Sequence, residues 1–213
     1  MRRLLPLVLA VVLLFAIPGC FGGGGGTDGG IDQTQIQAAI GQRIAAFVEA
    51  VEDFDVDGML GFLDEDSFSL TISEGGSEYS KTYTELKAEL EADEPKQLQW
   101  RKPESEGGNG HVLTMELGTI VYSSVSETGA QAAAPFTIKE SAENPQIPET
   151  TTDTGTIACE MVKLGGQWLC RQMTITYDDL AKASYRGAGS SESGNAESIE
   201  DGTTGFGFGQ FAF

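Results

Sequence analysis

The chain has 213 residues, of which 32 are Asp or Glu and 13 are Lys or Arg, so its net charge at pH 7 is −19. A surface this acidic repels the phosphates of nucleic acids and anionic lipid headgroups, which argues against binding to either through charge. The length suits one domain of about 150 residues with flanking tails.

The N-terminus begins with two positive charges and continues as an apolar stretch. Arg2 and Arg3 precede residues 4–17, a run of 14 residues without a polar side chain. At about 1.5 Å of rise per residue such a helix is roughly 21 Å long, shorter than the ~30 Å hydrocarbon core of a bilayer. The run therefore predicts an export signal over residues 1–19 and not a permanent membrane span.

This segment ends with Ile17, Pro18, Gly19 and Cys20. The pattern resembles the lipobox of bacterial lipoproteins, in which an aliphatic residue and two small residues precede a cysteine, although Pro18 stands where that family usually has Ala or Ser. The resemblance implies cleavage before Cys20, a diacylglycerol on its sulfur and acylation of the new amine. It also implies a membrane-anchored protein of the bacterial cell envelope, on the periplasmic or the cell-surface face. The alternative is an ordinary secretory signal with an unmodified cysteine.

Residues 20–31 are rich in glycine and are predicted to act as a flexible tether. About ten such residues have a root-mean-square reach of roughly 16–19 Å. A folded domain could therefore stand off the membrane to which Cys20 attaches it.

Two helices are predicted next. Residues 32–54 repeat apolar side chains every three or four positions, as on one face of a helix: Ile36, Ile40, Ile44, Phe47, Val48 and Val51. Asp32 and Gln35 fit a capping box at its start. A short second helix over residues 57–65 has an apolar face made of Met59, Leu60, Phe62 and Leu63.

Alternation of apolar and small polar residues over 67–76 predicts a half-buried strand. A third helix is predicted over residues 82–95, begun by Thr82 with Glu85 and ended by Pro95. The remaining segments before the last hairpin are predicted as strands over 96–102, 111–125 and 132–140, and as a loop over 141–155.

Residues 156–177 predict a β-hairpin with a glycine turn. Once Cys20 is assigned to lipid, Cys159 and Cys170 remain as an even pair in an exported protein, the setting in which disulfides persist. A loop at 164–165 places the two directly opposite each other, and a loop at 165–166 makes them diagonal neighbours on one face. A disulfide between them is predicted, with free thiols as the alternative.

Residues 186–213 form a low-complexity segment that ends in four phenylalanines. It has too little apolar content to build a core, so a disordered, sticky tail is predicted.

Helices followed by a run of strands predict an α+β fold and not alternating βαβ units. The order resembles the NTF2-like (SnoaL-like) family over residues 32–178. The resemblance rests on the segment AIGQRIAAFVEAVEDFDVDGMLGFLDEDSFSL and on a closing hairpin with VKLGGQWLC and MTITY. It implies a cone in which the N-terminal helices pack in a curved antiparallel sheet, often around an apolar pocket and frequently in a dimer. The corresponding domain is predicted over residues 32–185.

Acidic residues in 53–64 have the spacing of a calcium-binding loop, with positions 1, 3, 5 and 12 taken by Asp53, Asp55, Asp57 and Asp64. However, strand 67–76 follows where a second helix is needed, and Phe54 and Val56 occupy positions that are normally polar or small. The preferred interpretation is an acidic turn in which Asp55 or Asp57 caps the second helix. Calcium is the alternative, and no other metal or cofactor is expected.

Little in the sequence fits nucleophilic or acid–base catalysis. The single histidine, His111, opens a strand and is expected to face solvent. Some NTF2-like enzymes use a pocket Asp with Tyr or Asp hydrogen-bond donors. The candidates for such roles are the donors Tyr79, Tyr83, Tyr122 and Tyr177 and the acids Glu116 and Glu160, of which Glu160 is expected to face solvent.

Together these features predict a lipid-anchored envelope protein whose NTF2-like domain binds a small apolar ligand or a protein partner without catalysing a reaction. One alternative is an enzyme of the SnoaL or isomerase type that uses a pocket carboxylate. Another is an assembly or scaffold lipoprotein whose tail or sheet face engages a second envelope component. A homodimer is compatible with each, and no nucleic-acid partner is expected.

Overall fold

The computed structural model describes residues 32–178. The predicted signal peptide, Cys20 with its glycine tether, residues 179–185 of the predicted domain and the predicted tail over 186–213 lie outside the described residues. Within the described part, no helix is both long enough and apolar enough to cross a membrane.

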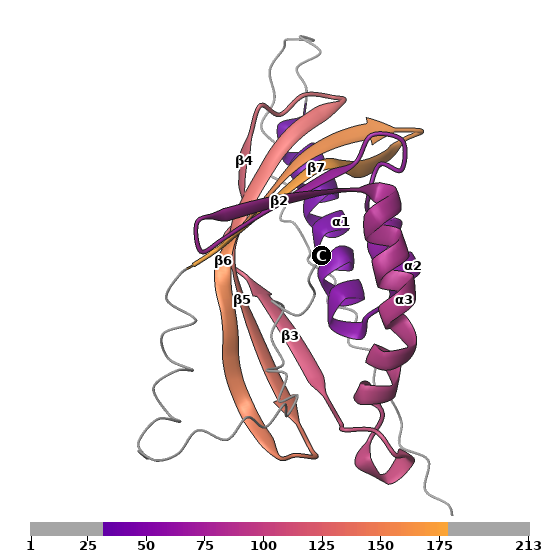
Figure 1. Ribbon diagram of the computed structural model, residues 1–213. Helices are drawn as coiled ribbons and strands as arrows, with labels where there is room; N and C mark the ends of the chain where they lie inside the picture. Colours follow the sequence, from indigo (N-terminus) through magenta and orange to yellow (C-terminus); the bar gives the residue numbers. More distant parts are fainter. Residues whose placement is uncertain (1–31, 179–213) are drawn as a thin grey trace, which may run out of the picture. The chain divides into compact units, whose positions relative to one another are not determined.

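Three α-helices pack on one face of a seven-stranded sheet (Figure 1). They are α1 (Gln33–Asp53), α2 (Val56–Leu60) and α3 (Tyr83–Arg101), and a short 3-10 helix, η1 (Glu104–Glu106), follows α3. α1 begins where the sequence predicts, because the Asp32 carboxylate accepts a hydrogen bond from the Gln35 N–H at 3.1 Å. α1 ends at Phe54, which adopts a left-handed backbone conformation with φ of 53°.

α3 differs from the prediction that a helix ends at Pro95 and a strand follows. It continues through Pro95 to Arg101. Pro95 removes one N–H from the helical ladder, but tertiary contacts hold the turn beyond it. The carbonyl of Trp100 accepts hydrogen bonds from the N–H groups of Asn109 at 3.0 Å and His111 at 3.1 Å, and Arg101 Nη1 donates to the Glu52 carbonyl.

The sheet has the order β2-β1-β7-β6-β5-β3, with β4 also paired to β5. Its strands are β1 (Ser69–Glu74), β2 (Ser77–Thr82), β3 (Val112–Leu117), β4 (Val121–Ser123), β5 (Gly129–Ala142), β6 (Ile147–Leu164) and β7 (Gln167–Tyr177). Neighbours are antiparallel except for β1 and β7, which pair in parallel from Ser69↔Gln172 to Ser73↔Thr176. The predicted α+β fold with a curved, largely antiparallel sheet is therefore confirmed, with one parallel pair added.

Three strand assignments differ from the sequence prediction. The predicted strand over 111–125 is two strands, β3 and β4, which both pair with β5. β2 is a strand where none was predicted, and residues 141–155 form the end of β5, a turn with a cis Asn144–Pro145 bond and the first half of β6 instead of a loop. This half of β6 reads IPETTTDTG and is largely exposed or half-buried, so it has no buried apolar face to reveal it. Backbone pairing with β5 holds it in place.

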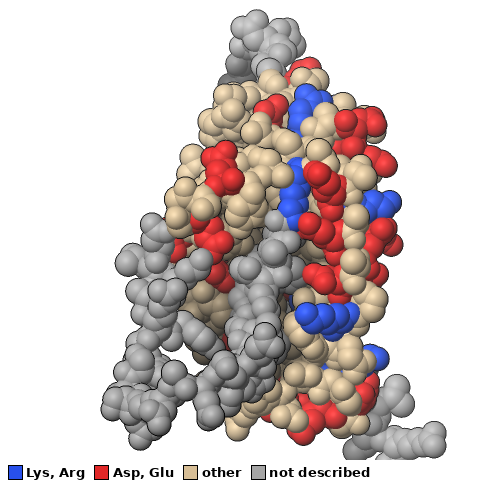
Figure 2. Space-filling view, viewed as in Figure 1, with Lys and Arg blue, Asp and Glu red and all other residues tan. Residues whose placement is uncertain are grey.

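Acidic side chains gather over α3, as Figure 2 shows. Ion pairs partly balance them: Lys87 lies 3.8 Å from Glu91, and Lys81 pairs with Glu89. On the other side of the same helix, Leu86, Leu90 and Gln97 are buried against the rest of the domain. α3 therefore separates an acidic surface from the interior.

Candidate apolar cavity and its polar border

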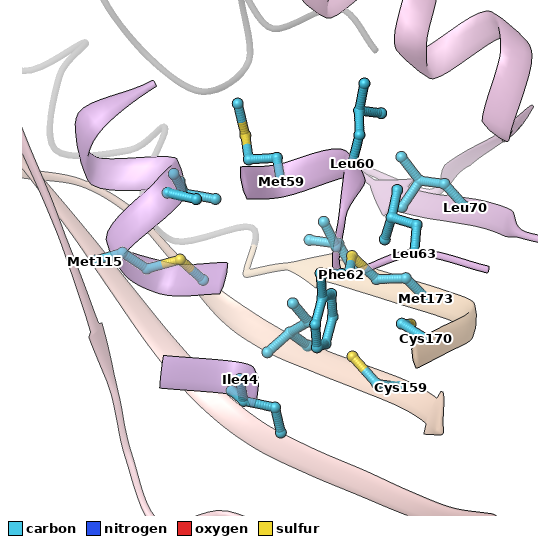
Figure 3. Close-up of a cluster of buried hydrophobic side chains, with 14 of the residues drawn as sticks. Ile44, Met59, Leu60, Phe62, Leu63, Leu70, Met115, Cys159, Cys170 and Met173 are labelled. Atoms are coloured by element: carbon cyan, nitrogen blue, oxygen red, sulfur yellow. The ribbon is translucent and has the colours of Figure 1, made fainter. Parts of the chain in front are cut away.

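An apolar cavity of about 60 Å³ lies between the helices and the sheet. Its wall is contributed by all three helices, the segment after α2 and four strands: Phe47, Val51, Phe54, Met59, Leu63, Phe68, Leu70, Leu86, Leu90, Met115, Ile157, Met173 and Ile175. Figure 3 shows Met59, Met115 and Met173 with Leu63 and Leu70 in this buried cluster.

The chemistry of this cavity suits an apolar guest. Every lining residue is apolar, so the wall gives a water molecule no hydrogen-bond partners to replace those it leaves in bulk. The three methionines have flexible, polarisable side chains that adjust to guests of different shape. The cavity can therefore take up hydrocarbon or aromatic groups and has no side chain that could act as an acid, a base or a nucleophile.

A polar cluster borders the cavity at the C-terminal half of α3. Arg101 Nη1 donates to the Glu52 carbonyl, and the Glu52 carboxylate accepts a 2.7 Å hydrogen bond from the N–H of the lining residue Met115. The Arg101 guanidinium lies 5.9 Å from the ring centroid of Phe54, another lining residue. Charged groups thus come close to the apolar wall without forming part of it.

The Arg101 side chain is held partly out of water. Burial lowers the pKa of its guanidinium, and nearby Asp53 and Glu140 oppose this by favouring the charged form. Its Nε and Nη2 atoms are buried and have no hydrogen-bond partner within residues 32–178. Glu140 itself is only 6% exposed.

His111 is buried, which contradicts the prediction that it faces solvent. It is 8% exposed, and its Nε2 lies 3.5 Å from Glu140 Oε2, a charged pair only when the imidazole is protonated. The error arises because His111 opens β3 at the point where the extended α3 covers the sheet. Without that extension the side chain would have been exposed.

The acidic loop does not assemble a calcium site. Asp55 caps α2 by accepting from the Gly58 N–H at 3.1 Å, as the capping interpretation predicts. Asp64 points to other partners, accepting from Ser67 Oγ at 2.6 Å and from Arg171 Nε at 3.3 Å. No group of three or more His, Cys, Asp or Glu within residues 32–178 could hold a metal ion, so Asp53 and Asp57 do not converge with the others on one point.

Cys159 and Cys170 are buried free thiols in this structure, which therefore does not show the predicted disulfide. Leu164 pairs with Gln167, which places the hairpin loop at 165–166 and makes the cysteines diagonal neighbours. A bulge at Arg171 then shifts the pairing, so that Cys159 lies opposite Met173 and Met161 opposite Cys170. A hydrogen bond with the Cys159 thiol, together with burial, raises the pKa of Cys170 well above its usual value.

The other candidates for catalysis lie outside the cavity. Burial raises the pKa of Tyr122 and, with nearby Asp153, that of Tyr177, but within the described residues no tyrosine lines the cavity. Glu116 lies 2.6 Å from Lys139 on the surface, and Glu160 is exposed as predicted. The strand residues singled out as acids or donors therefore do not meet in one site.

Arg101 and Gln97 were missed because residues 96–102 were read as a strand. A signal was available: Leu86, Leu90, Gln97 and Arg101 are spaced by four, seven and four residues, which keeps them on one helical face. The prediction instead followed Pro95, at which the helix is expected to end.

A curved, largely antiparallel sheet with helices on one face and an apolar cavity between them is the NTF2-like, or cystatin-like, fold. No protein-family model and no curated protein sequence matches this chain. Solved structures do match. The beta subunit of a provisionally named aromatic-ring-hydroxylating dioxygenase from Novosphingobium aromaticivorans is 14% identical, with a TM-score of 0.54 over 68% of this chain and 90% of that one.

Two further structures have a TM-score of 0.52. A provisionally named scytalone dehydratase from Novosphingobium aromaticivorans is 15% identical over 69% of this chain and 87% of its own. The protein Aln2 from a Streptomyces species is 12% identical over 70% of this chain and 96% of its own. At these identities the likeness establishes the fold alone, and it supports the NTF2-like resemblance drawn from the sequence.

Proposed function

We propose that this protein is a lipid-anchored component of the bacterial cell envelope whose NTF2-like domain binds a small apolar ligand. The anchor is supported by the N-terminal sequence, in which a short apolar run ends at Ile17-Pro18-Gly19-Cys20. The binding role is supported by one observation above all, the cavity of about 60 Å³ with a wall of apolar side chains, which has room for an apolar group of only a few heavy atoms.

Binding is favoured over catalysis because the lining residues offer no titratable group. An enzyme that used a pocket carboxylate would need that carboxylate at the wall, and Asp64 is instead committed to Ser67 and Arg171. The envelope-scaffold role and a homodimer remain alternatives that rest on surfaces and not on the cavity.

The methionines supply a direct test of ligand binding. The methyl groups of Met59, Met115 and Met173 line the cavity, whereas Met161 is fully buried elsewhere in the core. With ¹³C-methyl-methionine, pressurised xenon, which is small enough for a cavity of about 60 Å³, should shift the first three resonances and leave Met161 unchanged. Uniform shifts, or none, would refute the binding role.

A matched pair of substitutions on α3 strengthens this test. Leu90→Phe places a larger side chain at the cavity wall, whereas Leu98→Phe makes the same change at a position that is 45% exposed. The first should abolish the xenon shifts and the second should retain them. Equal binding by both variants would contradict the assignment of the cavity as the site.

The anchor has a separate test. Cys20→Ala removes the sulfur that would carry the diacylglycerol, so the protein should move from the membrane to the soluble fraction of the envelope. Cys159→Ala is the matched control and should stay with the membrane. Retention of Cys20→Ala at the level of the unchanged protein would refute lipidation.

We further propose that Cys159 and Cys170 form a disulfide after export. The support is their diagonal placement on one hairpin and the hydrogen bond between their thiols, in a compartment where disulfides persist. The protein isolated from the envelope should gain two hydrogens in intact mass on reduction. An unchanged mass would show that both thiols stay free.

A further inference from the structure

The border of the cavity carries hydrogen-bonding capacity that the domain leaves unused. Arg101 Nη1 is bound to the Glu52 carbonyl, but Nε and Nη2 are buried without a partner in residues 32–178. Glu140 Oε2 is likewise buried, with no hydrogen-bond partner in that part of the chain, although the imidazole of His111 lies 3.5 Å away. Buried polar atoms without partners are costly and rare in folded proteins.

The unused guanidinium atoms have a defined geometry. Nε and Nη2 form one edge of the planar group and point their N–H bonds in nearly the same direction, so a single acceptor group can receive both. Nη1 holds the opposite side of the group to the end of α1. The edge is therefore fixed in orientation before any ligand arrives.

The charges around this edge favour a neutral acceptor. The charge on Arg101 is already opposed by nearby Glu140 and by Asp53, and Glu52 adds a third carboxylate bonded to Met115. An added carboxylate would be repelled by these groups. His111 supplies a compensating charge only when its imidazole is protonated.

The border of the cavity also offers a hydrogen-bond acceptor near the two N–H donors of Arg101. Glu140 Oε2 can receive one N–H while Arg101 donates to a carbonyl oxygen. The adjacent lining residues Phe54 and Met115 connect this polar edge to the apolar cavity. Figure 1 shows the C-terminal half of α3 beside β3, where the Trp100–His111 hydrogen bond joins the two elements.

We propose that this border recognises the head of the ligand as a neutral amide. The amide carbonyl accepts hydrogen bonds from Arg101 Nε and Nη2, and the amide N–H donates one to Glu140. The apolar group of the ligand enters the cavity. The inference rests on the proposed function, since it presumes that the cavity is the ligand site. It narrows the ligand class from any small apolar molecule to an apolar amide. Because Nε and Nη2 are buried, a ligand reaches this edge only after side chains around it move aside, while Nη1 keeps Arg101 in place.

The test compares propanamide, propanoate and 1-propanol, whose short chains suit the small cavity and whose heads differ. Titrated into the full-length protein and followed by the methionine methyl resonances, propanamide should bind at least about tenfold more tightly than the other two, because only it satisfies both Arg101 and Glu140 without adding charge. Equal affinities, or tighter binding of propanoate, would overturn the proposal.

Arg101→Lys keeps the positive charge and removes the pair of parallel N–H donors formed by Nε and Nη2. It should weaken propanamide binding by about tenfold and leave the xenon shifts unchanged, whereas Lys102→Gln, a change at an exposed neighbour, should affect neither. If xenon binds and propanamide shows no preference, the head-group assignment fails and the apolar site stands. If xenon also fails to bind, both are refuted. Should Arg101→Lys not fold, the ligand series on the unchanged protein decides.

Discussion

Asp64 is a buried carboxylate whose interactions make a sharp prediction about pH. It is 3% exposed, and its Oδ2 accepts hydrogen bonds from Ser67 Oγ at 2.6 Å and Arg171 Nε at 3.3 Å. The bond from Ser67, followed by the bond and charge of Arg171, outweighs burial and lowers the pKa of Asp64 below its ordinary value of 3.8. The folded protein therefore prefers the ionised form.

The perturbation is Asp64→Asn, which keeps the size of the side chain and removes its charge. A hydrogen bond to a charged group contributes about 1.5–3 kcal/mol, and Arg171 adds less because its side chain is 42% exposed and screened by water. Asn can retain part of the Ser67 bond. We therefore expect the free energy of unfolding at pH 7 to fall by about 2 kcal/mol.

The sign of the pH dependence follows from the lowered pKa. The stabilisation is fully present above the unfolded-state pKa of Asp64 and is lost as pH falls through the lower folded-state pKa. Urea unfolding at several pH values should show the difference between Asp64→Asn and the unchanged protein shrinking below about pH 4. Glu65→Gln, at an exposed neighbour, is the control and should show no such trend. A constant difference between pH 7 and pH 3 would refute the reasoning.

Three further outcomes follow from local structure. Thr82→Ala removes the hydroxyl that caps α3 by accepting from the Glu85 N–H, and urea unfolding should show a loss of about 1 kcal/mol. Gly155→Ala puts a Cβ against the Thr176 carbonyl and 2.9 Å from the Phe136 ring, so a loss of about 2 kcal/mol or more is expected by the same method; an unchanged midpoint would show that the strands can separate. Millimolar calcium should leave the melting temperature unchanged, because Asp64 is held by other partners; a rise would restore the calcium interpretation.

The sequence predicts best the elements whose signals are local. The Asp32 cap gives α1 its correct start, the apolar spacing gives its end to within one residue, and the glycine turn gives the β6–β7 hairpin. In both cases the residues that determine the structure are close neighbours in the chain. The α+β order and the NTF2-like resemblance follow from them.

The sequence predictions are wrong where contacts between residues far apart in the chain determine the secondary structure. α3 passes Pro95 because the N–H groups of Asn109 and His111 both donate to the Trp100 carbonyl near its end, which no local pattern shows. The first half of β6 is a strand because β5 pairs with it, although its own side chains remain largely outside the core. The candidate site depends on the first of these errors, since the extended α3 carries Arg101 to the border of the cavity. The apolar wall could be anticipated as a core, but not its polar border.

The parallel pairing of β1 with β7 has a consequence for the order of folding. β1 has strand partners only in β2 and β7 within the described sheet, and β7 ends at Tyr177, the last strand residue of the described chain. An isolated two-stranded hairpin is marginal in water, so the β1–β2 pair gains a stable sheet only after β7 has been synthesised. Contacts this distant in sequence also close slowly. A chain that must leave the cell unfolded would benefit from this delay, since its sheet cannot be completed before nearly the whole domain has been made.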